Sequence, residues 1–190
     1  MNTKQQSRQQ ALQRRRKLSP EERTTASTHI QNALLLQLEQ RELTTTPVLI
    51  YRSMDDEVET RYILSMYRPL IFAPVTHSHD AIQWRETGSD TIWKTGNFGV
   101  EEPAGGRVWA PELGKGVLVC PVVGFDRAGN RLGFGMGCFD RWLAQFNEHL
   151  QIIIGLAFSC QEVPAIPVEA HDVPLDIIIT EREIIECRKH

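Results

Sequence analysis

The chain lacks any hydrophobic run that approaches the roughly 20 apolar residues of a membrane-spanning helix. Its first residues are polar and basic, without the apolar region of a secretory signal, so we expect neither a membrane segment nor a leader. The four cysteines have no CxxC spacing and form no cluster with histidine that has zinc-site spacing. We therefore expect reduced thiols and a cytoplasmic protein.

Strong charge of one sign and an obvious nucleophile are also missing. The net charge is −3, which gives no reason to expect general affinity for nucleic acid. No serine lies in a nucleophile elbow, and no histidine has a spacing that argues for a base or a metal ligand. This lack favours phosphoryl transfer, in which positioning and charge neutralisation do most of the catalysis.

The apolar pattern that is present predicts one α/β domain over residues 1–190. A polar, basic helix covers 1–17, and a second helix begins at Ser19-Pro20 with a capping box and ends near residue 40. Leu150 is assigned to the apolar face of a helix that follows residue 138. Strands are expected over the following ranges: 48–51, 70–74, 81–84, 91–93, 117–123, 152–158 and 175–180. Residues 96–111 are expected to form a loop.

One glycine-rich stretch follows the predicted strand 117–123 and leads into the predicted helix. Gly133, Gly135 and Gly137 alternate between Arg131 and Arg141, and Asp140 precedes the second arginine. The stretch is not a Walker A loop, because no Gly-Lys-Ser/Thr sequence follows it. It is not a dinucleotide fingerprint either, because the position of the third glycine holds Cys138 or Asp140. Either it is a tight turn that needs small residues, or it is another kind of phosphate cradle with arginine partners and a carboxylate for magnesium.

Three further segments carry weaker signals, each with a structural alternative. Lys4, Arg8 and Arg15 lie on one side of the first helix, which is either a solvated face or a surface for an anion. Residues 55–60 follow the strand 48–51 and form either a polar cap or a carboxylate site for a heterocycle. Asp172 lies near prolines in a loop and is either a turn residue or a partner of Asp140.

Together these segments resemble the 5-formyltetrahydrofolate cyclo-ligase family. The central match is Arg131-Leu132-Gly133-x-Gly-x-Gly-x-x-Asp140-Arg141. The ordered set is more specific than any one piece, and the other pieces are these: Lys4-x-x-x-Arg8, Arg15-x-x-Leu18-Ser19, Asp56-Glu57-Val58-Glu59-Thr60, Glu102-Pro103 and His171-Asp172-Val173-Pro174.

The resemblance implies a single compact α/β domain with a mainly parallel central sheet, flanking helices and a few antiparallel edge strands. It also implies an ATP- and Mg²⁺-dependent ligase of folate and one-carbon metabolism. In this family ATP phosphorylates the formyl oxygen of 5-formyltetrahydrofolate, N10 closes the ring, and 5,10-methenyltetrahydrofolate, ADP and phosphate are released. We expect a monomer that acts on these small molecules, with no nucleic-acid or membrane partner.

Carried over by position, the resemblance assigns a role to each site residue. Arg131 and Arg141 are the catalytic cations, and Asp140 and Asp172 hold Mg²⁺. ATP is assigned to the basic helix and the glycine-rich stretch, with Arg15 a further candidate: Lys4, Arg8, Arg131, Leu132, Gly133, Phe134, Gly135, Met136, Gly137, Cys138 and Phe139. The folate is assigned to the following residues: Arg52, Glu57, Phe98, Gly135, Met136, Gly137 and Cys138.

The chain departs from the family pattern at Cys138-Phe139, where a tandem aromatic pair is usual, and at Arg52, where an apolar contact is expected. The first departure keeps a second hypothesis open, a non-catalytic nucleotide- or folate-binding homologue. A third hypothesis is an RNA-binding module that uses the basic first helix. It predicts RNA binding that weakens steeply with salt, and the acidic overall balance counts against it.

Overall fold

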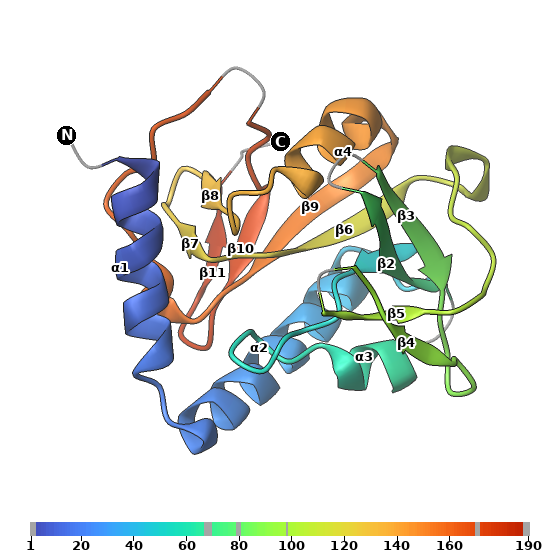
Figure 1. Ribbon diagram of the computed structural model, residues 1–190, viewed down its shortest axis with the longest axis horizontal. Helices are drawn as coiled ribbons and strands as arrows, with labels where there is room; N and C mark the ends of the chain where they lie inside the picture. Colours follow the sequence, from blue (N-terminus) through green and yellow to red (C-terminus); the bar gives the residue numbers. More distant parts are fainter. Residues whose placement is uncertain (1–2, 67–69, 79–80, 98, 170–171, 188–190) are drawn as a thin grey trace.

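A seven-stranded sheet in the order β11-β10-β9-β6-β1-β2-β3 runs through the computed structural model, which describes residues 3–66, 70–78, 81–97, 99–169 and 172–187 (Figure 1). The five inner strands are parallel, and the strand at each edge is antiparallel to its neighbour. The strands of this sheet are β1 (Val48–Ile50), β2 (Ile71–Ser78), β3 (Ala81–Glu86), β6 (Gly116–Pro121), β9 (Leu150–Leu156), β10 (Ile177–Ile179) and β11 (Ile184–Glu186). The predicted fold class, a mainly parallel sheet with antiparallel edges, is confirmed.

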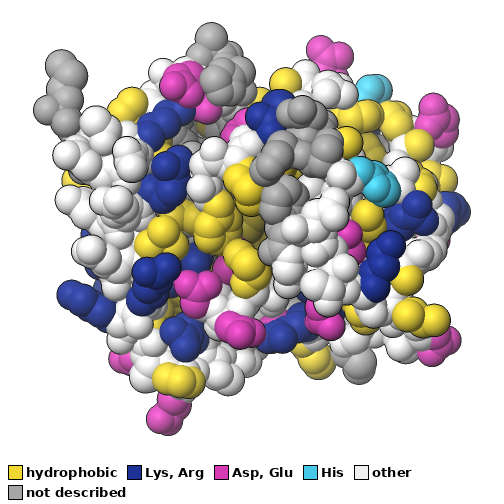
Figure 2. All heavy atoms as spheres, viewed as in Figure 1, with side chains coloured by type: hydrophobic (Ala, Val, Ile, Leu, Met, Phe, Trp, Pro, Cys, Tyr) yellow, Lys and Arg dark blue, Asp and Glu magenta, His cyan; other side chains and the backbone are white. Residues whose placement is uncertain are grey.

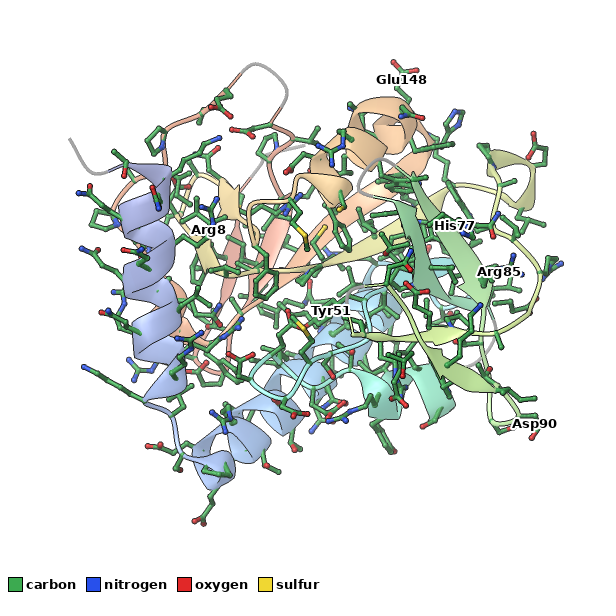
Figure 3. The ribbon with its side chains drawn as sticks, viewed as in Figure 1. Arg8, Tyr51, His77, Arg85, Asp90 and Glu148 are labelled. Atoms are coloured by element: carbon green, nitrogen blue, oxygen red, sulfur yellow. The ribbon has the colours of Figure 1, made fainter. Side chains whose placement is uncertain are left out.

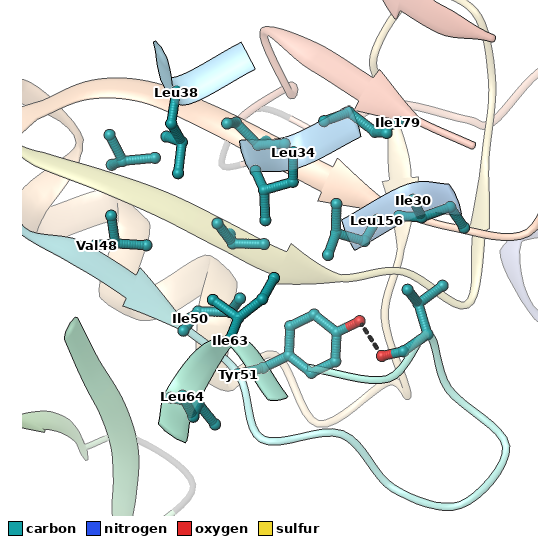
Figure 4. Close-up of a cluster of buried hydrophobic side chains, with 14 of the residues drawn as sticks. Ile30, Leu34, Leu38, Val48, Ile50, Tyr51, Ile63, Leu64, Leu156 and Ile179 are labelled. Carbon is teal, nitrogen blue, oxygen red and sulfur yellow. Dashed lines mark hydrogen bonds between the residues drawn. The ribbon is translucent and has the colours of Figure 1, made fainter. Parts of the chain in front are cut away.

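Alternate side chains of the inner strands fill two hydrophobic layers, one on each face of the sheet. On one face, Val48 and Ile50 of β1 pack with α2 (Pro20–Gln40) and α3 (Arg61–Met66) (Figure 4). On the other face, Leu49 packs in a layer that includes Trp142 and Leu143 of α4 (Cys138–Phe146). Because both faces are covered, the strands are apolar almost throughout.

The first helix, α1 (Lys4–Arg16), stands beside the sheet and packs on the glycine-rich region. Its Ala11 belongs to a small buried cluster with Val123 and Leu132, so α1 covers the hairpin β7 (Gly124–Phe125) and β8 (Arg131–Leu132) (Figure 1). This packing places Arg8 of α1 next to the loop that follows β8. At Ser19, the predicted capping box is present before α2.

The structure corrects three local predictions and adds one strand that was not expected. Leu150 begins β9 rather than extending α4, because it pairs with Gly116 of β6 and a 3₁₀ turn, Asn147–His149, ends the helix first. The expected loop 96–111 contains β5 (Glu101–Pro103), which pairs with β4 (Trp93–Thr95) in a separate two-stranded sheet. The segment between the predicted strand 117–123 and the alternating glycines forms the β7–β8 hairpin. The edge strand β11 was not predicted. Tertiary pairing decided each case.

Candidate active site

A cavity of about 550 Å³ opens at the carboxyl ends of β1, β2 and β6. Tyr51, Thr76 and Pro121, at or just beyond those ends, form part of its wall. The space-filling view shows hydrophobic side chains in the hollow at the centre of this face, with Lys and Arg side chains along the α1 side (Figure 2). This edge of a parallel sheet is where α/β proteins bind ligands.

Most of the predicted site residues line this one cavity, although they come from distant segments. They are Lys4, Arg8, Arg52, Glu57, the run from Arg131 to Asp140, and Asp172. The structure therefore brings the basic helix, the turn after β1, the glycine-rich stretch and the 172 loop together around one ligand space.

The glycine-rich stretch turns sharply between β8 and α4. Gly135 and Gly137 have φ angles of 97° and 67°, a region that favours glycine. Gly137 is the N-cap of α4, so the helix begins at the cavity wall with Asp140 in its first turn. The first N–H groups of a helix have no partner within it, which makes this end of α4 suitable for an anion.

Two arginines tie this loop to its surroundings. Arg8 donates from Nε to the carbonyl oxygen of Gly133 at 2.7 Å, and its side chain points from α1 towards the hairpin (Figure 3). Arg131 donates to Oδ1 of Asp140 at 2.6 Å, and only 4% of its side chain is exposed. The guanidinium carbon of Arg131 lies 5.8 Å from the ring centre of Phe139.

Lys4 binds two further acidic residues of the cavity wall. Its Nζ donates to Asp172 at 2.7 Å and to Glu169 at 2.9 Å. Partial burial lowers the pKa of Lys4, but the bonds to the two carboxylates outweigh it, so the net pKa is raised. The lysine therefore stays charged over the physiological range.

Glu57 lies in a tight turn between β1 and α3. Its Oε2 accepts a hydrogen bond from the N–H of Met54 at 2.8 Å, and its own N–H donates to the Met54 carbonyl. The Tyr51 hydroxyl donates to the carbonyl of Val58 at 2.8 Å and pins the turn to the core (Figure 4). Burial raises the pKa of Glu57 to about 7, against the lowering effects of the Met54 N–H and the charge of Arg15.

Arg52 connects the end of β1 to the β4–β5 hairpin. Its guanidinium lies 3.8 Å from the ring centre of Trp93 and forms an ion pair with Glu101. Val100 and Glu102 of the same hairpin line the cavity. Arg52 therefore both borders the ligand space and holds the hairpin beside it.

Two predicted residues, Arg15 and Arg141, are not part of the cavity wall. Arg15 is buried behind the glycine-rich stretch, with an exposed fraction of 1%, and pairs with Asp56 instead of facing the ligand space. Arg141 is exposed on α4 and donates to the carbonyl of Met136 at 2.7 Å. Phe98 lies outside the described residues.

Sequence reasoning missed a further group of wall residues. They are Tyr51, Met54, Pro74, Thr76, Ile82, Val100, Pro121 and Glu169. Tyr51, Pro74, Thr76 and Pro121 lie at or near the carboxyl ends of parallel strands, a position that could have identified them. Ile82 and Val100 reach the cavity wall because β3 pairs with β2 and because β4 and β5 form a hairpin. No local sequence pattern predicts either pairing.

Two carboxylates of the wall, Asp140 and Asp172, are of the type that binds Mg²⁺. Asp140 and Asp172 come from distant segments to the same cavity, and each is now paired with a cation. Mg²⁺ typically takes one or two carboxylates together with substrate phosphates and water. In the described part of the chain, no cluster of three or more His, Cys, Asp or Glu residues forms a metal cage.

Fold and cavity together define an α/β protein with a candidate ligand site at the carboxyl edge of its sheet, lined by apolar groups together with both cations and carboxylates. The helices that the structure describes include none with the length and apolar character needed to cross a membrane.

Comparison with known proteins identifies the family. The family model described as "5-formyltetrahydrofolate cyclo-ligase family" matches residues 1–181. A 5-formyltetrahydrofolate cyclo-ligase of Haemophilus influenzae is 36% identical over 157 residues, which cover 78% of this chain and 82% of the relative. The enzyme of the same name from Mus musculus is 29% identical and covers 89% of each chain.

Two solved structures share the fold over nearly the whole chain. The 5,10-methenyltetrahydrofolate synthetase of Aquifex aeolicus has a TM-score of 0.79 and 28% identity, covering 98% of this chain and 94% of its own. The synthetase of Mycoplasma pneumoniae has a TM-score of 0.71 and 25% identity, covering 94% and 98%. The chain belongs to the 5-formyltetrahydrofolate cyclo-ligase family, so the predicted family and the predicted enzyme class, a ligase, are confirmed.

Proposed function

We propose that this protein converts 5-formyltetrahydrofolate to 5,10-methenyltetrahydrofolate and consumes ATP with Mg²⁺. The observation that carries the proposal is the convergence of Lys4, Arg8, Glu57, the glycine-rich stretch and Asp172 on one cavity. Family membership supports the substrate, and the charge distribution supports the nucleotide. The cationic side suits phosphates, and the mainly apolar remainder, with the two buried carboxylates Glu57 and Glu102, suits a pterin.

The proposed reaction has two steps. The formyl oxygen attacks the γ-phosphorus of ATP, its bond to phosphorus forms, and ADP leaves. N10 then attacks the activated formyl carbon and loses its proton to water, and the carbon–oxygen bond breaks as phosphate departs with the formyl oxygen. An amide-like oxygen is a poor leaving group until it is phosphorylated, which explains the need for ATP.

The residues of the cavity take corresponding roles in this proposal. Arg8, Lys4 and the N–H groups at the start of α4 bind the phosphates, while Arg131 offsets the charge on the transferred phosphoryl group. Arg141 supports the same charge from the exposed side of α4. Asp140 and Asp172 would hold Mg²⁺, which supplies charge neutralisation between the phosphates when bound. The helix α1 thus contributes directly to the nucleotide site.

Glu57 takes the folate side. As a carboxylate it can accept two N–H bonds from the pterin, and the bond from Met54 fixes one of its oxygens. The β4–β5 hairpin held by Arg52 covers the apolar part of the ligand. One chain supplies all of these groups, so we propose an active monomer in the cytoplasm, organised as a single domain.

The direct test is turnover. Purified protein with 5-formyltetrahydrofolate, ATP and Mg²⁺ is expected to form the methenyl product, followed by its absorbance, with one ADP released per product. Omission of ATP or Mg²⁺ is expected to stop the reaction. Binding of both ligands without product would identify a non-catalytic homologue, and salt-sensitive RNA binding without folate binding would favour the RNA-binding hypothesis.

A further inference from the structure

Arg15 is an unusually buried charge for a helix at the edge of the molecule. Only 1% of its side chain is exposed, and Nη2 donates to Oδ2 of Asp56 at 2.8 Å. Among the described residues, its buried Nε and Nη1 have no hydrogen-bond partner. A buried ion pair with unsatisfied donors is costly, so stability alone gives no reason for an arginine here.

The two contacts of Arg15 reach opposite sides of the cavity. Asp56 immediately precedes Glu57 in the turn after β1. On the other side, the guanidinium carbon lies 5.7 Å from the ring centre of Phe134, which is in the glycine-rich stretch and lines the cavity. The same guanidinium therefore touches the elements proposed to bind folate and phosphate.

The charge of Arg15 also acts on Glu57. Burial raises the pKa of Glu57, the Met54 N–H and Arg15 lower it, and Asp56 raises it. Further charged or titratable groups lie in the same turn or line the same cavity: Tyr51, Glu59, Lys4, Arg8, Arg52, Glu102, Arg131, Asp140, Glu169 and Asp172. Of the charged groups that act on Glu57 most directly, only Arg15 is positive.

We infer that Arg15 is a positioning residue. Its guanidinium binds Asp56 on one side and packs against the ring of Phe134 on the other, and it thereby holds Glu57 next to the glycine-rich stretch. The inference depends on the proposed function only for the identity of the ligand, a folate. It replaces the sequence-based candidacy of Arg15 as a phosphate ligand. A consequence is that the positive charge of Arg15 favours the ionised form of Glu57 and limits the rise in its pKa that burial causes.

The test compares Arg15→Met with Arg16→Met, the same substitution at the next residue of α1, where the side chain is exposed. We expect Arg15→Met to raise the KM for 5-formyltetrahydrofolate about tenfold at pH 7.5, with partial recovery at pH 9 and a smaller change in the KM for ATP. Arg16→Met is expected to leave both constants near the wild-type values.

A second measurement reads the titration without turnover. ¹³C NMR of labelled glutamate carboxyls reads the pKa of Glu57 directly, with its signal assigned by its loss in Glu57→Gln. We expect the wild-type signal to titrate with a pKa of about 7. Arg15→Met should move the midpoint up, and Asp56→Asn should move it down, because one removes a positive neighbour and the other a negative one.

If Arg15 had only a structural role, the titration midpoint of Glu57 would not shift in opposite directions in Arg15→Met and Asp56→Asn. An unchanged midpoint in Arg15→Met, or shifts of the same sign in both variants, would overturn the inference. Asp56→Asn provides the reading if Arg15→Met does not fold, and a midpoint that does not fall in Asp56→Asn would then overturn it. Absence of turnover in the wild type would refute the proposed function, while the titration would still decide the role of Arg15.

Discussion

The two sides of the cavity are built in different ways. On the glycine-rich side, charges are paired with one another: Arg131 with Asp140, and Lys4 with Asp172. On the side of the turn after β1, one carboxylate, Glu57, is fixed by backbone and core contacts, and its pKa is raised by burial. Under the proposed function, the first side exchanges its internal pairs for phosphate and Mg²⁺, whereas the second offers Glu57 in a preset position.

Exposure follows the same division. Phe134 and Met136 of the glycine-rich stretch are 40% and 41% exposed, whereas Glu57 is 7% exposed and Tyr51 is 3% exposed. A loop whose side chains face solvent can adjust around a large anion, and a turn pinned to the core cannot. We therefore expect substitutions on the first side to affect mainly the chemical step, and those on the second to affect mainly folate binding.

The largest effect is expected for Arg131→Met. Loss of the guanidinium removes the charge that faces the transferred phosphoryl group, so kcat should fall about 10³-fold. Arg127→Met is the matched control, since Arg127 is in the same hairpin but pairs with Glu162 and Glu183 away from the cavity. Steady-state kinetics decide the point, and a variant at residue 131 that keeps more than a tenth of kcat would contradict the assignment.

Glu57→Gln is expected to have the next largest effect, on the other side of the comparison. The amide can offer only one acceptor to the pterin, so the KM for 5-formyltetrahydrofolate should rise roughly 10²-fold. The KM for ATP should change only a few-fold. Equal increases in both constants would mean that the two sides are not separate in function.

The same variant sharpens the comparison through stability. The pKa of Glu57 in the folded state, about 7, lies above its ordinary value of 4.5. Between pH 4.5 and pH 7 the native state therefore binds more protons than the unfolded state, and the wild type loses stability as pH rises through this range. Glu57→Gln removes this loss and should be more stable above pH 7 by at most about 3 kcal/mol. Urea unfolding at pH 5 and pH 8 measures it; a wild-type stability equal to that of the variant at pH 8 would argue against a buried carboxylate.

Phe139→Tyr should have the smallest effect. The ring meets Trp84 edge to face, with 6.0 Å between ring centres, and the added hydroxyl restores a group that the family pattern often carries. We expect kcat/KM to stay within about threefold of the wild type. Loss of turnover in a steady-state assay would contradict the assignment of residue 139 to the ATP side of the cavity.

Much of the fold follows from local pattern. The capping box at Ser19 and the apolar runs of β1, β6 and β9 carry their own signals, because they reflect helix ends and burial on both faces of a sheet. β5 and β11 include glutamates among their three residues and depend on a partner strand, so no continuous apolar run marks them. Leu150 fits a helical face equally well, and only its pairing with Gly116 decides for a strand.

The site, like the fold, combines features that local sequence marks with features that only tertiary packing decides. The residue types of the glycine-rich stretch and the spacing of Lys4 and Arg8 point to an anion, and the structure brings them to one cavity. Arg15 has the same spacing signal but is turned behind the loop, because the packing of α1 on the β7–β8 hairpin buries its side chain. Whether a helix arginine faces a ligand or the interior depends on tertiary packing, which spacing alone does not encode.

A crystal structure with ADP and phosphate tests the central claim most directly. We predict phosphate density against residues 131–141, within reach of Arg8 and Arg131, while the turn that carries Glu57 keeps the position that it has without ligand. Phosphate density away from residues 131–141, or against Glu57, would contradict the division of the cavity into a phosphate side and a folate side.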